Sequence, residues 1–254
     1  MLTRDILNLI VRVTDEVIRP RFGALADDQV FLKGPGDYVT VADREAEAAL
    51  AEALSAAHRG AVVVGEEATA ADPTLRDGIL GHDHCFVVDP IDGTGNFVRS
   101  NPDHAVMVGE LRRGVATRGW IWLPEHGEAY VGELGEGVTR NGVALQPLIR
   151  GARPRGAATV KRLLGRQSDA LAGPVSGTWS CAGVDYAKII NGVVDFVVYK
   201  PPKPWDHVPG TLMLRELGGV ARTTAGAEYT AATAGTDLIV AASEAAHAAA
   251  LAIS

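Results

Sequence analysis

Apolar residues recur every three or four positions between residues 4 and 19, which predicts an amphipathic helix. Pro20 cannot donate the amide hydrogen bond that a continuing helix needs, so we expect the helix to end there. The alanine-rich residues 43–58 show a second helical pattern. Thr40 and Asp43, three positions apart at its start, resemble a capping box, in which each side chain bonds the backbone amide of the other residue.

Shorter apolar runs, separated by turn residues, predict the strands of the fold. We expect strands at residues 61–68, 84–93, 104–111, 118–124, 127–134, 193–200 and 237–243. Residues 32–43 begin as a glycine-rich loop, and further helical patterns lie at 183–192, 206–219 and 244–252. The pair Asn141-Gly142 is typical of a two-residue β-hairpin turn.

The order of these elements predicts a layered α+β fold. Helices and strands mix without strict β-α-β alternation, and the consecutive strands of the first half are typical of a meander. No linker-like segment divides the chain, so we interpret residues 1–254 as a single domain. Within this domain we expect two lobes, at about residues 1–145 and 146–254.

The composition and charge of the chain limit the partners that the protein is expected to bind. The formal net charge is −7 and the sequence has no basic stripe, which argues against a nucleic-acid polymer or an anionic membrane as a partner. A small anionic substrate stays compatible, because a bound cation reverses the local field. Charged residues interrupt the apolar N-terminus, so we interpret it as neither a signal peptide nor a membrane span. Cys85 and Cys181 are interpreted as reduced thiols of a cytoplasmic protein.

Acidic residues follow apolar or aromatic runs at Glu66, Asp89, Asp92 and Asp206. Unpaired buried carboxylates are costly, and several in one pocket repel one another. A hard divalent cation removes that conflict, and Mg²⁺ prefers carboxylate and water oxygens together with substrate phosphates. Zinc is not indicated, because the sequence has no CxxC pair and its histidine-dense stretch, residues 82–85, is expected to enter a strand from a turn.

The stretch DPIDGTG, residues 89–95, combines features of a metal site and a phosphate site. Its proline fixes the backbone, so that the two aspartates can lie close together with the Ile91 carbonyl between them. A helix that starts at Gly93 and Thr94 would point its amides at a phosphate, and the Thr94 hydroxyl could hold a water.

Each of these features also has a purely structural interpretation. An Asp-Pro-x-Asp-Gly stretch is a common turn, and adjacent glutamates at Glu66 and Glu67 are typical of a solvated loop. Asp206 could cap a helix. The occurrence of all of them at the ends of apolar runs favours one shared site.

Three segments together resemble the inositol monophosphatase family: GEE (65–67), DPIDGTGNF (89–97) and PWDHVPG (204–210). The resemblance covers nearly the whole chain, since it continues in GDYVTVAD (36–43), RNGVAL (140–145) and RELGGVAR (215–222). It implies a five-layer α-β-α-β-α sandwich and a lithium-sensitive, Mg²⁺-dependent phosphomonoesterase with two or three ions. The expected substrate is a small phosphorylated metabolite of the inositol monophosphate type, and the expected assembly is a homodimer.

The resemblance also implies roles for individual residues. The metal ligands would be Glu66, Asp89, the Ile91 carbonyl, Asp92 and Asp206, so that the first lobe holds all of them but the last. Glu66 and Thr94 would activate the attacking water, and Asp43 would hold a third ion through water. Lys33 lies near the lysine of a mobile loop in the family. The substrate contacts would be Asp92, Gly93, Thr94, Ser180, Cys181, Ala182, Tyr199 and Asp206.

The departures from the family lie on the substrate side. Gly95 stands where relatives have threonine or lysine, and Tyr199 stands where relatives acting on inositol have glutamate. Lys200 and Lys203 are either solvated or meet a second anionic group, as in a bisphosphate or a nucleotide. Fructose-1,6-bisphosphatase, histidinol-phosphatase and 3′-phosphoadenosine nucleotide phosphatase activities stay open as alternatives, and so does a catalytically silent binding protein on the same fold.

Overall fold

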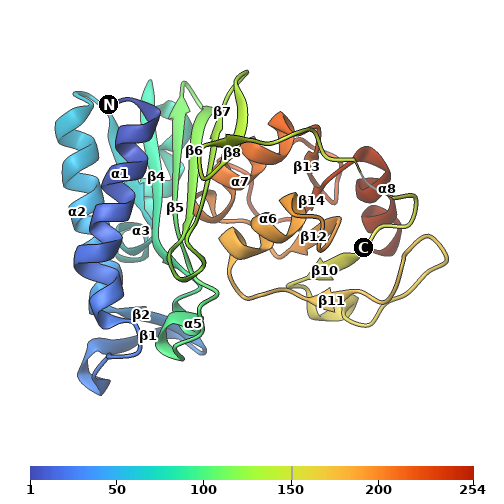
Figure 1. Ribbon diagram of the computed structural model, residues 1–254, viewed down its shortest axis with the longest axis horizontal. Coiled ribbons are helices and arrows are strands. Elements are labelled where there is room, and N and C mark those ends of the chain that lie inside the picture. Colours follow the sequence, from blue (N-terminus) through green and yellow to red (C-terminus); the bar gives the residue numbers. More distant parts are fainter. Residues whose placement is uncertain (150) are drawn as a thin grey trace.

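The computed structural model describes residues 1–149 and 151–254. Within these residues, helices and sheets stack in five layers in the order α-β-α-β-α, which confirms the expected sandwich (Figure 1). The α-helices are α1 (Thr3–Val13), α2 (Val41–Ala57), α3 (Glu66–Ala71), α4 (Thr74–Asp77), α5 (Thr94–Val98), α6 (Ala182–Ile190), α7 (Pro204–Glu216) and α8 (Glu244–Ile253). The strands are β1 (Val30–Gly34), β2 (Asp37–Thr40), β3 (Val62–Gly65), β4 (His84–Asp92), β5 (Ala105–Arg112), β6 (Val115–Leu123), β7 (Glu128–Glu133), β8 (Gly137–Arg140), β9 (Val143–Ala144), β10 (Gly156–Ala158), β11 (Ser176–Gly177), β12 (Phe196–Tyr199), β13 (Val220–Thr223) and β14 (Leu238–Ala241).

Helices α1 and α2 form the outer layer over the first large sheet, at the left of Figure 1. The apolar positions of the α1 pattern, such as Ile6 and Ile10, are fully buried against that sheet and α2. The expected capping box of α2 is present: the Thr40 hydroxyl accepts from the Asp43 amide, and Asp43 Oδ2 accepts from the Thr40 amide at 2.8 Å. The cap joins β2 to α2 and holds the Asp43 carboxylate in the interior.

The first large sheet has the strand order β3-β4-β5-β6-β7-β8-β9 in the described chain. Strands β3 and β4 pair in parallel, and from β4 to β9 each strand pairs antiparallel with the next, as expected for a meander. Asn141 and Gly142 have φ angles of 50° and 78°, and they form the predicted two-residue turn between β8 and β9. Strand β4 is buried along its whole length, because helices cover both faces of this sheet.

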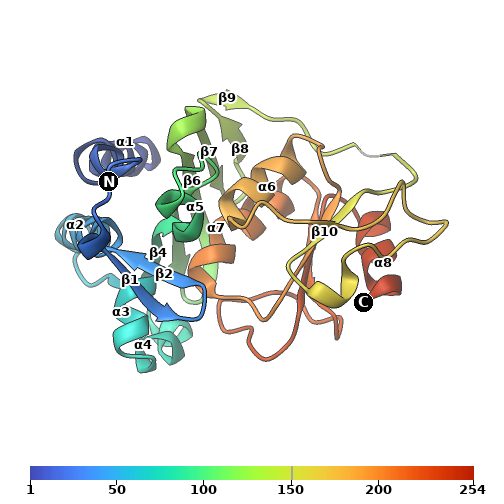
Figure 2. The same ribbon diagram turned by 90° about the horizontal axis from the view of Figure 1, so that it is seen from below.

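Helices α6 and α7 form the middle layer between the two large sheets (Figure 2). Three glycines that neighbour one another across β5, β6 and β7 let α7 lie close to the sheet: Gly109, Gly119 and Gly132. A Cβ atom on Gly119 would lie 2.8 Å from Pro209 Cα, which is a backbone atom that cannot move aside locally. This close approach sets the position of α7, whose first turn carries Asp206.

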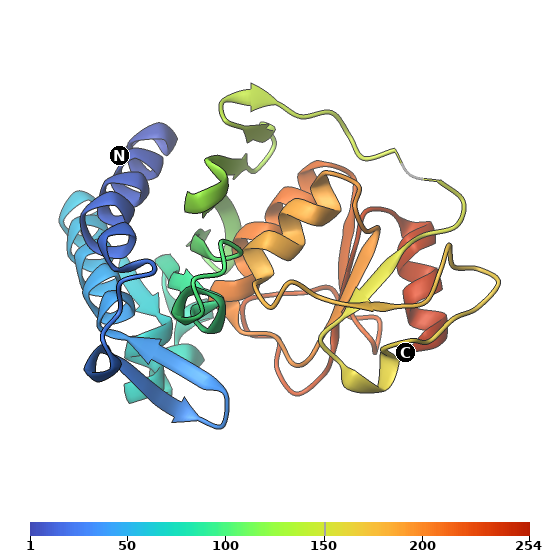
Figure 3. The same cartoon turned by 60° about the horizontal axis from the view of Figure 1, so that its bottom comes forward.

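The second large sheet has the strand order β11-β10-β12-β14-β13 among the described residues, and α8 covers its outer face (Figure 3). Strand β10 pairs in parallel with β11 and β12, whereas β14 pairs antiparallel with β12 and β13. Phe196 and Ile239 of this sheet are fully buried in a cluster with Ala246 and Ala250 of α8. The predicted strands at 193–200 and 237–243 and the closing helix are therefore confirmed.

The structure corrects several expectations about local structure. The segment 32–43 was expected to begin as a glycine-rich loop, but its first part belongs to the antiparallel hairpin β1–β2. The predicted strand 61–68 ends at Gly65, and Glu66 opens α3. The first helix changes at Thr14 into a π-helical turn, Thr14–Ile18, where the Thr14 hydroxyl donates to the Ile10 carbonyl at 2.8 Å and competes with the regular backbone bonds.

Candidate metal centre

Glu66 is placed at the junction of β3 and α3. Glu47 of α2 holds this junction, because its carboxylate accepts from the amides of Glu67 at 2.7 Å and Ala68 at 2.8 Å. These amides belong to the first turn of α3 and lack intrahelical partners, so Glu47 acts as a cap supplied by another helix. Gly65 leaves room for the cap, since a Cβ atom there would lie 2.1 Å from Glu47 Cδ. Sequence reasoning missed Glu47, because one glutamate in an alanine-rich helix carries no local signal.

Asp89 and Asp92 lie at the buried end of β4. The pairing with β5 is shifted between them: Asp89 faces Met107 and Asp92 faces Ala105, so one residue is extra in β4. This bulge contains the proline of the DPID stretch and turns the chain toward α5. The Ile91 amide donates to Asp89 Oδ1 at 3.1 Å, which fixes the orientation of that carboxyl.

Asp206 comes from the opposite side of the site, in the first turn of α7. The helix begins with Lys203 as its N-cap residue and Pro204 in the first helical turn, a position where proline is favoured. A carboxylate in this turn interacts favourably with the positive end of the helix dipole. The side chain is held at the site by the contact between α7 and the glycines of the sheet.

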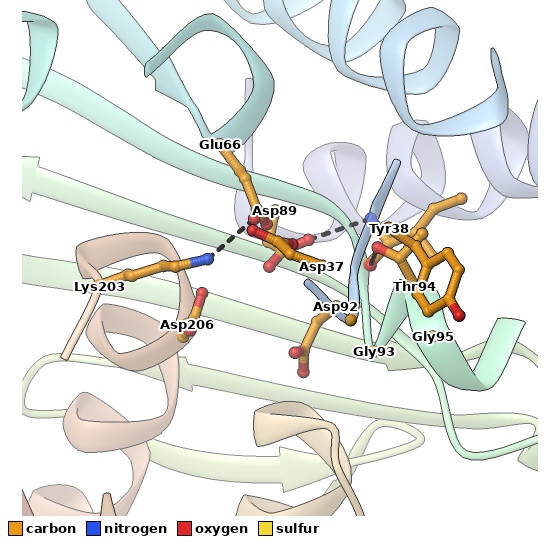
Figure 4. Close-up of a pocket in the computed structure, with 12 residues that line it drawn as sticks. Asp37, Tyr38, Glu66, Asp89, Asp92, Gly93, Thr94, Gly95, Lys203 and Asp206 are labelled. Carbon is orange, nitrogen blue, oxygen red and sulfur yellow. Dashed lines mark hydrogen bonds and ion pairs between the residues drawn. The ribbon is translucent and has the colours of Figure 1, made fainter. Parts of the chain in front are cut away.

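The carboxylates of Glu66, Asp89 and Asp206 converge, with one oxygen of each lying within 4.8 Å of the others. They line a cavity of about 140 Å³ together with Asp92. Figure 4 shows the three side chains directed toward a common space, with Asp92 below them. Burial, and then the neighbouring carboxylates, raise the pKa of Asp89 well above its ordinary value. Such a cluster of hard oxygen ligands is suited to a divalent cation, which would relieve the repulsion.

Two lysines pair with Glu66. Lys33 Nζ lies 3.0 Å and Lys203 Nζ 2.9 Å from Glu66 Oε1, and Lys33 also lies 2.9 Å from Glu67 Oε1. Burial alone would raise the pKa of Glu66, but the two ammonium groups outweigh burial and lower the pKa to about 2. Glu66 is therefore ionised near neutral pH.

Asp92 is anchored from α6. Its Oδ2 atom accepts from the Gly183 amide at 2.6 Å and from Cys181 Sγ at 3.0 Å. Burial, the charge of Asp92 and this hydrogen bond raise the pKa of the Cys181 thiol well above its ordinary value. The thiol is thus a hydrogen-bond donor that orients Asp92, and it lacks the properties of a nucleophile.

Gly93 and Thr94 open α5 at the edge of the same cavity. Gly93 has a φ angle of 80°, and a Cβ atom there would lie 2.9 Å from Cys181 Cβ, so both backbone conformation and space require glycine. The Thr94 hydroxyl lies 2.9 Å from the Ile91 carbonyl oxygen and 3.0 Å from Asp43 Oδ1. Burial raises the pKa of Asp43 to about 7, although hydrogen bonds from Thr40 and Thr94 oppose this rise.

The remaining sequence-predicted residues lie outside the lining of this cavity: Ser180, Cys181, Ala182, Tyr199 and Lys200. Tyr199 is buried, and its hydroxyl donates to Asp185 Oδ2 of α6 at 3.1 Å. The backbone of Ser180 lies against Gly93, since a Cβ atom on Gly93 would lie 3.2 Å from the Ser180 carbonyl oxygen. A direct substrate contact by any of them stays a prediction.

A second group of possible metal ligands, His58, His84 and Glu110, lies near the start of β4. His84 belongs to the histidine-dense stretch, and its Nε2 atom lies 2.7 Å from Glu110 Oε1. Arg112 and Arg118 also form ion pairs with Glu110. Two guanidinium groups already neutralise this carboxylate and would repel a cation, so the group is a buried ion-pair network.

Comparison with known proteins places this fold and its cluster of carboxylates among the phosphoric monoester hydrolases. A model of the inositol monophosphatase family matches residues 4–254, and the chain belongs to this family. It is 32% identical over 219 residues to the inositol-1-monophosphatase of Mesorhizobium japonicum, a match that covers 78% of this chain and 76% of the relative.

Solved structures show the same fold. Staphylococcal inositol monophosphatase-1, in an inhibitory complex soaked with LiCl, superposes with a TM-score of 0.82 and 20% identity, over 100% of this chain and 95% of that one. A dual-specific IMPase/NADP phosphatase bound with D-inositol-1-phosphate superposes with a TM-score of 0.81 and 21% identity, over 100% and 96% of the two chains. Within the described residues, no helix combines the length and apolar character that crossing a bilayer requires.

Proposed function

We propose that the protein is a Mg²⁺-dependent phosphomonoesterase that hydrolyses a small phosphorylated metabolite by means of an activated water. The observation that carries the proposal is the convergence of Glu66, Asp89 and Asp206 within 4.8 Å of one another, next to the amides that open α5. Buried carboxylates at this spacing favour a divalent cation, and amides at a helix start attract a phosphate.

The donor set fits Mg²⁺. The ligands would be Glu66, Asp89, the Ile91 carbonyl, Asp92 and Asp206, all of which line one cavity and offer hard oxygen atoms. We propose that two or three ions bind there, with Asp43 reaching the third through water. When bound, the ions would lower the pKa of a water molecule and stabilise negative charge on the leaving oxygen.

The protein's own groups then perform defined tasks. Glu66, kept ionised by Lys33 and Lys203, is the group that would take a proton from the attacking water. Thr94, fixed through its hydroxyl by Asp43 and the Ile91 carbonyl, would orient that water, while the amides of Gly93 and Thr94 bind the phosphate. Cys181 and Gly183 hold Asp92 in place.

The substrate that we propose is an inositol monophosphate or a similar sugar phosphate. Two relatives support this substrate: the Mesorhizobium japonicum protein is an inositol-1-monophosphatase, and the dual-specific IMPase/NADP phosphatase was solved with D-inositol-1-phosphate bound. NADP phosphatase activity of that second protein shows that the fold also serves nucleotides. Fructose 1,6-bisphosphate, histidinol phosphate and 3′-phosphoadenosine nucleotides are therefore the alternatives.

We also propose lithium sensitivity, a homodimer and a cytoplasmic location. The inhibitory LiCl complex of the staphylococcal enzyme supports the first. The two free, buried thiols, Cys85 and Cys181, are compatible with a reducing compartment. Light scattering coupled to gel filtration measures the assembly, and phosphate release in a LiCl series measures the inhibition.

The test of the proposed function is phosphate release from these substrates with and without Mg²⁺. Asp206→Asn keeps the shape of a ligand but removes its charge, and we expect it to lower kcat/KM by about 100-fold or more. Asp169→Asn, at an exposed loop position, is the matched control and should retain full activity. Equal activity of wild type and Asp206→Asn, or activity that survives chelation of divalent ions, would contradict the proposal.

A further inference from the structure

Two ammonium groups meet at one carboxylate oxygen of the metal centre. Lys33 Nζ lies 3.0 Å and Lys203 Nζ 2.9 Å from Glu66 Oε1. A carboxylate oxygen offers two lone pairs, so the two lysines already use both acceptor sites of this atom. They come from distant segments, since Lys33 belongs to β1 and Lys203 is the N-cap residue of α7. Their charges offset part of the repulsion within the cluster of carboxylates.

A divalent cation and these lysines compete for the same carboxylate. A Mg²⁺–oxygen bond is only about 2.1 Å long, so an ion held by Glu66 would lie within a few ångströms of both ammonium groups. Like charges at that distance repel strongly in a partly buried site. We therefore expect one of the two ammonium groups to move away when an ion binds.

Lys203 is the lysine that is free to leave. Lys33 is held by a second carboxylate, because its Nζ atom also lies 2.9 Å from Glu67 Oε1, and its side chain is only 16% exposed. Within residues 1–149 and 151–254, Lys203 forms an ion pair with Glu66 alone, and its side chain is 44% exposed. Displacing Lys203 thus breaks one ion pair and needs no opening of the fold.

The displaced ammonium group has an alternative position. Lys203 lines the metal cavity and also a neighbouring groove of about 360 Å³, to which Thr69, Arg76 and Trp205 contribute. Its Nζ atom lies 5.8 Å from the centre of the Trp205 ring, within the range of a cation–π contact. A rotation of the side chain would exchange the contact with Glu66 for the ring face and the solvent of the groove.

We infer that Lys203 is a built-in counter-ion of the metal centre, which pairs with Glu66 in the metal-free protein and is displaced into the neighbouring groove when Mg²⁺ binds. The inference rests on the proposed function, because it assigns Glu66 to the metal shell. Lys203 then lowers the affinity for Mg²⁺, since its ion pair must be broken, and stabilises the metal-free fold. With Mg²⁺ in place, Lys33 and the cation keep Glu66 ionised.

The first experiment is chemical labelling of the lysines of the wild type, because it needs no variant. An acetylating reagent is applied at pH 8 in EDTA and in Mg²⁺, and mass spectrometry measures the modification of each lysine. A paired ammonium group reacts slowly, so we expect the reactivity of Lys203 to rise severalfold in Mg²⁺. Lys33 should stay protected by Glu67. The exposed Lys200, which lines neither the cavity nor the groove, is the control within the same molecule.

The second experiment measures the Mg²⁺ affinity by calorimetric titration, without turnover. Lys203→Met removes the charge but keeps an apolar stem of similar length, and Lys203→Arg keeps the charge. We expect Lys203→Met to tighten Mg²⁺ binding by about 10-fold and to lower the Tm in EDTA by about 2–4 °C. Lys203→Arg should stay close to the wild type. Lys200→Met, the matched control for the loss of one positive charge, should change neither quantity.

The inference is overturned if the reactivity of Lys203 does not rise in Mg²⁺, or if Lys203→Met binds Mg²⁺ no more tightly than the wild type. Equal tightening in Lys200→Met would also overturn it, because net charge would then explain the effect. If Lys203→Met does not fold, the labelling of the wild type decides alone. If neither the wild type nor Lys203→Met binds Mg²⁺, the proposed function itself fails, which is a different result from equal affinities.

Discussion

Replacing Asp89 by asparagine is expected to stabilise the protein in a chelator while abolishing its activity. Asp89 is only 2% exposed, and carboxylate oxygens of Glu66 and Asp206 lie within 4.8 Å of it. At that distance and an effective dielectric constant of about 20, two full negative charges repel by about 3 kcal/mol. Asparagine has nearly the same shape and can still accept from the Ile91 amide, but it carries no charge.

The expected gain in the free energy of unfolding is about 1–3 kcal/mol near pH 8, because the two lysines on Glu66 already relieve part of the repulsion. The sign of the pH dependence follows from the raised pKa of Asp89. The folded state holds this proton more tightly than the unfolded chain, so the stability of the wild type falls as the pH rises above the ordinary pKa of 3.8. Asp89→Asn lacks that loss, and its advantage should grow with pH and disappear near pH 4.

The assay is urea-induced unfolding followed by tryptophan fluorescence, at pH 4 and pH 8, in EDTA and in Mg²⁺. Mg²⁺ should stabilise the wild type by binding the folded state, whereas Asp89→Asn should gain little. Asp169→Asn controls for the loss of one negative charge elsewhere. The reasoning is refuted if Asp89→Asn is less stable than the wild type at pH 8 in EDTA, or if its effect does not depend on pH.

Three further predictions concern the groups that support the site. Gly119→Ala should lower the free energy of unfolding by about 1–3 kcal/mol and raise the Mg²⁺ concentration for half-maximal activity, because the added Cβ atom displaces α7. The control Gly81→Ala should do neither, since a Cβ atom at Gly81 meets open space. Unchanged unfolding and Mg²⁺ titrations of Gly119→Ala would contradict this account. Burial opposes ionisation of Glu110, but Arg118, Arg112 and His84 lower its pKa to about 2. The ionised Glu110 should therefore stabilise the folded state by about 3 kcal/mol above pH 4.5, and this contribution should be lost as the pH falls toward 2. Denaturant unfolding of Glu110→Gln at pH 7 and pH 3, beside Glu52→Gln, measures this, and equal losses at both pH values would disprove it. Cys181→Ser keeps a hydrogen-bond donor to Asp92 and should retain activity, whereas Cys181→Ala should need a higher Mg²⁺ concentration for half-maximal activity. An inactive Cys181→Ser variant would instead indicate thiol chemistry.

Local signals in the sequence were sufficient for much of the fold. The helical spacing of apolar residues in α1, the Thr40–Asp43 box before α2 and the Asn141-Gly142 turn each depend on neighbours within a few positions, and the structure confirms all of them. The same holds for the DPIDGTG stretch, where proline restricts the backbone and glycine permits the positive φ angle of Gly93. The hairpin β1–β2 was missed because Gly34, Pro35 and Gly36 at its turn are typical of a loop. The strands β10 and β11 were missed because three and two residues are too few to show a period.

At the candidate site, too, the sequence predicted the residue types but not their arrangement in space. The residue types at Glu66, Asp89, Asp92 and Asp206 indicated a metal site because acids at the ends of apolar runs are costly unless something binds them. Their actual separation depends on distant segments. Glu47 of α2 caps the turn that bears Glu66, and Asp92 is anchored by Cys181, the N-cap residue of α6, and by Gly183 within α6.

The sequence by itself determined the local elements, the ligand chemistry and the family. Only the tertiary structure decided which charges face which cavity. Arg76 looks like an ordinary surface residue in the sequence, and only in the folded chain do the Pro202 and Thr233 carbonyls hold it beside the groove that Lys203 also lines. The physical reason is the distance along the chain over which each effect acts. Backbone preferences depend on neighbours within a few residues, whereas the charges around a side chain come from groups that are remote in the sequence and close in space.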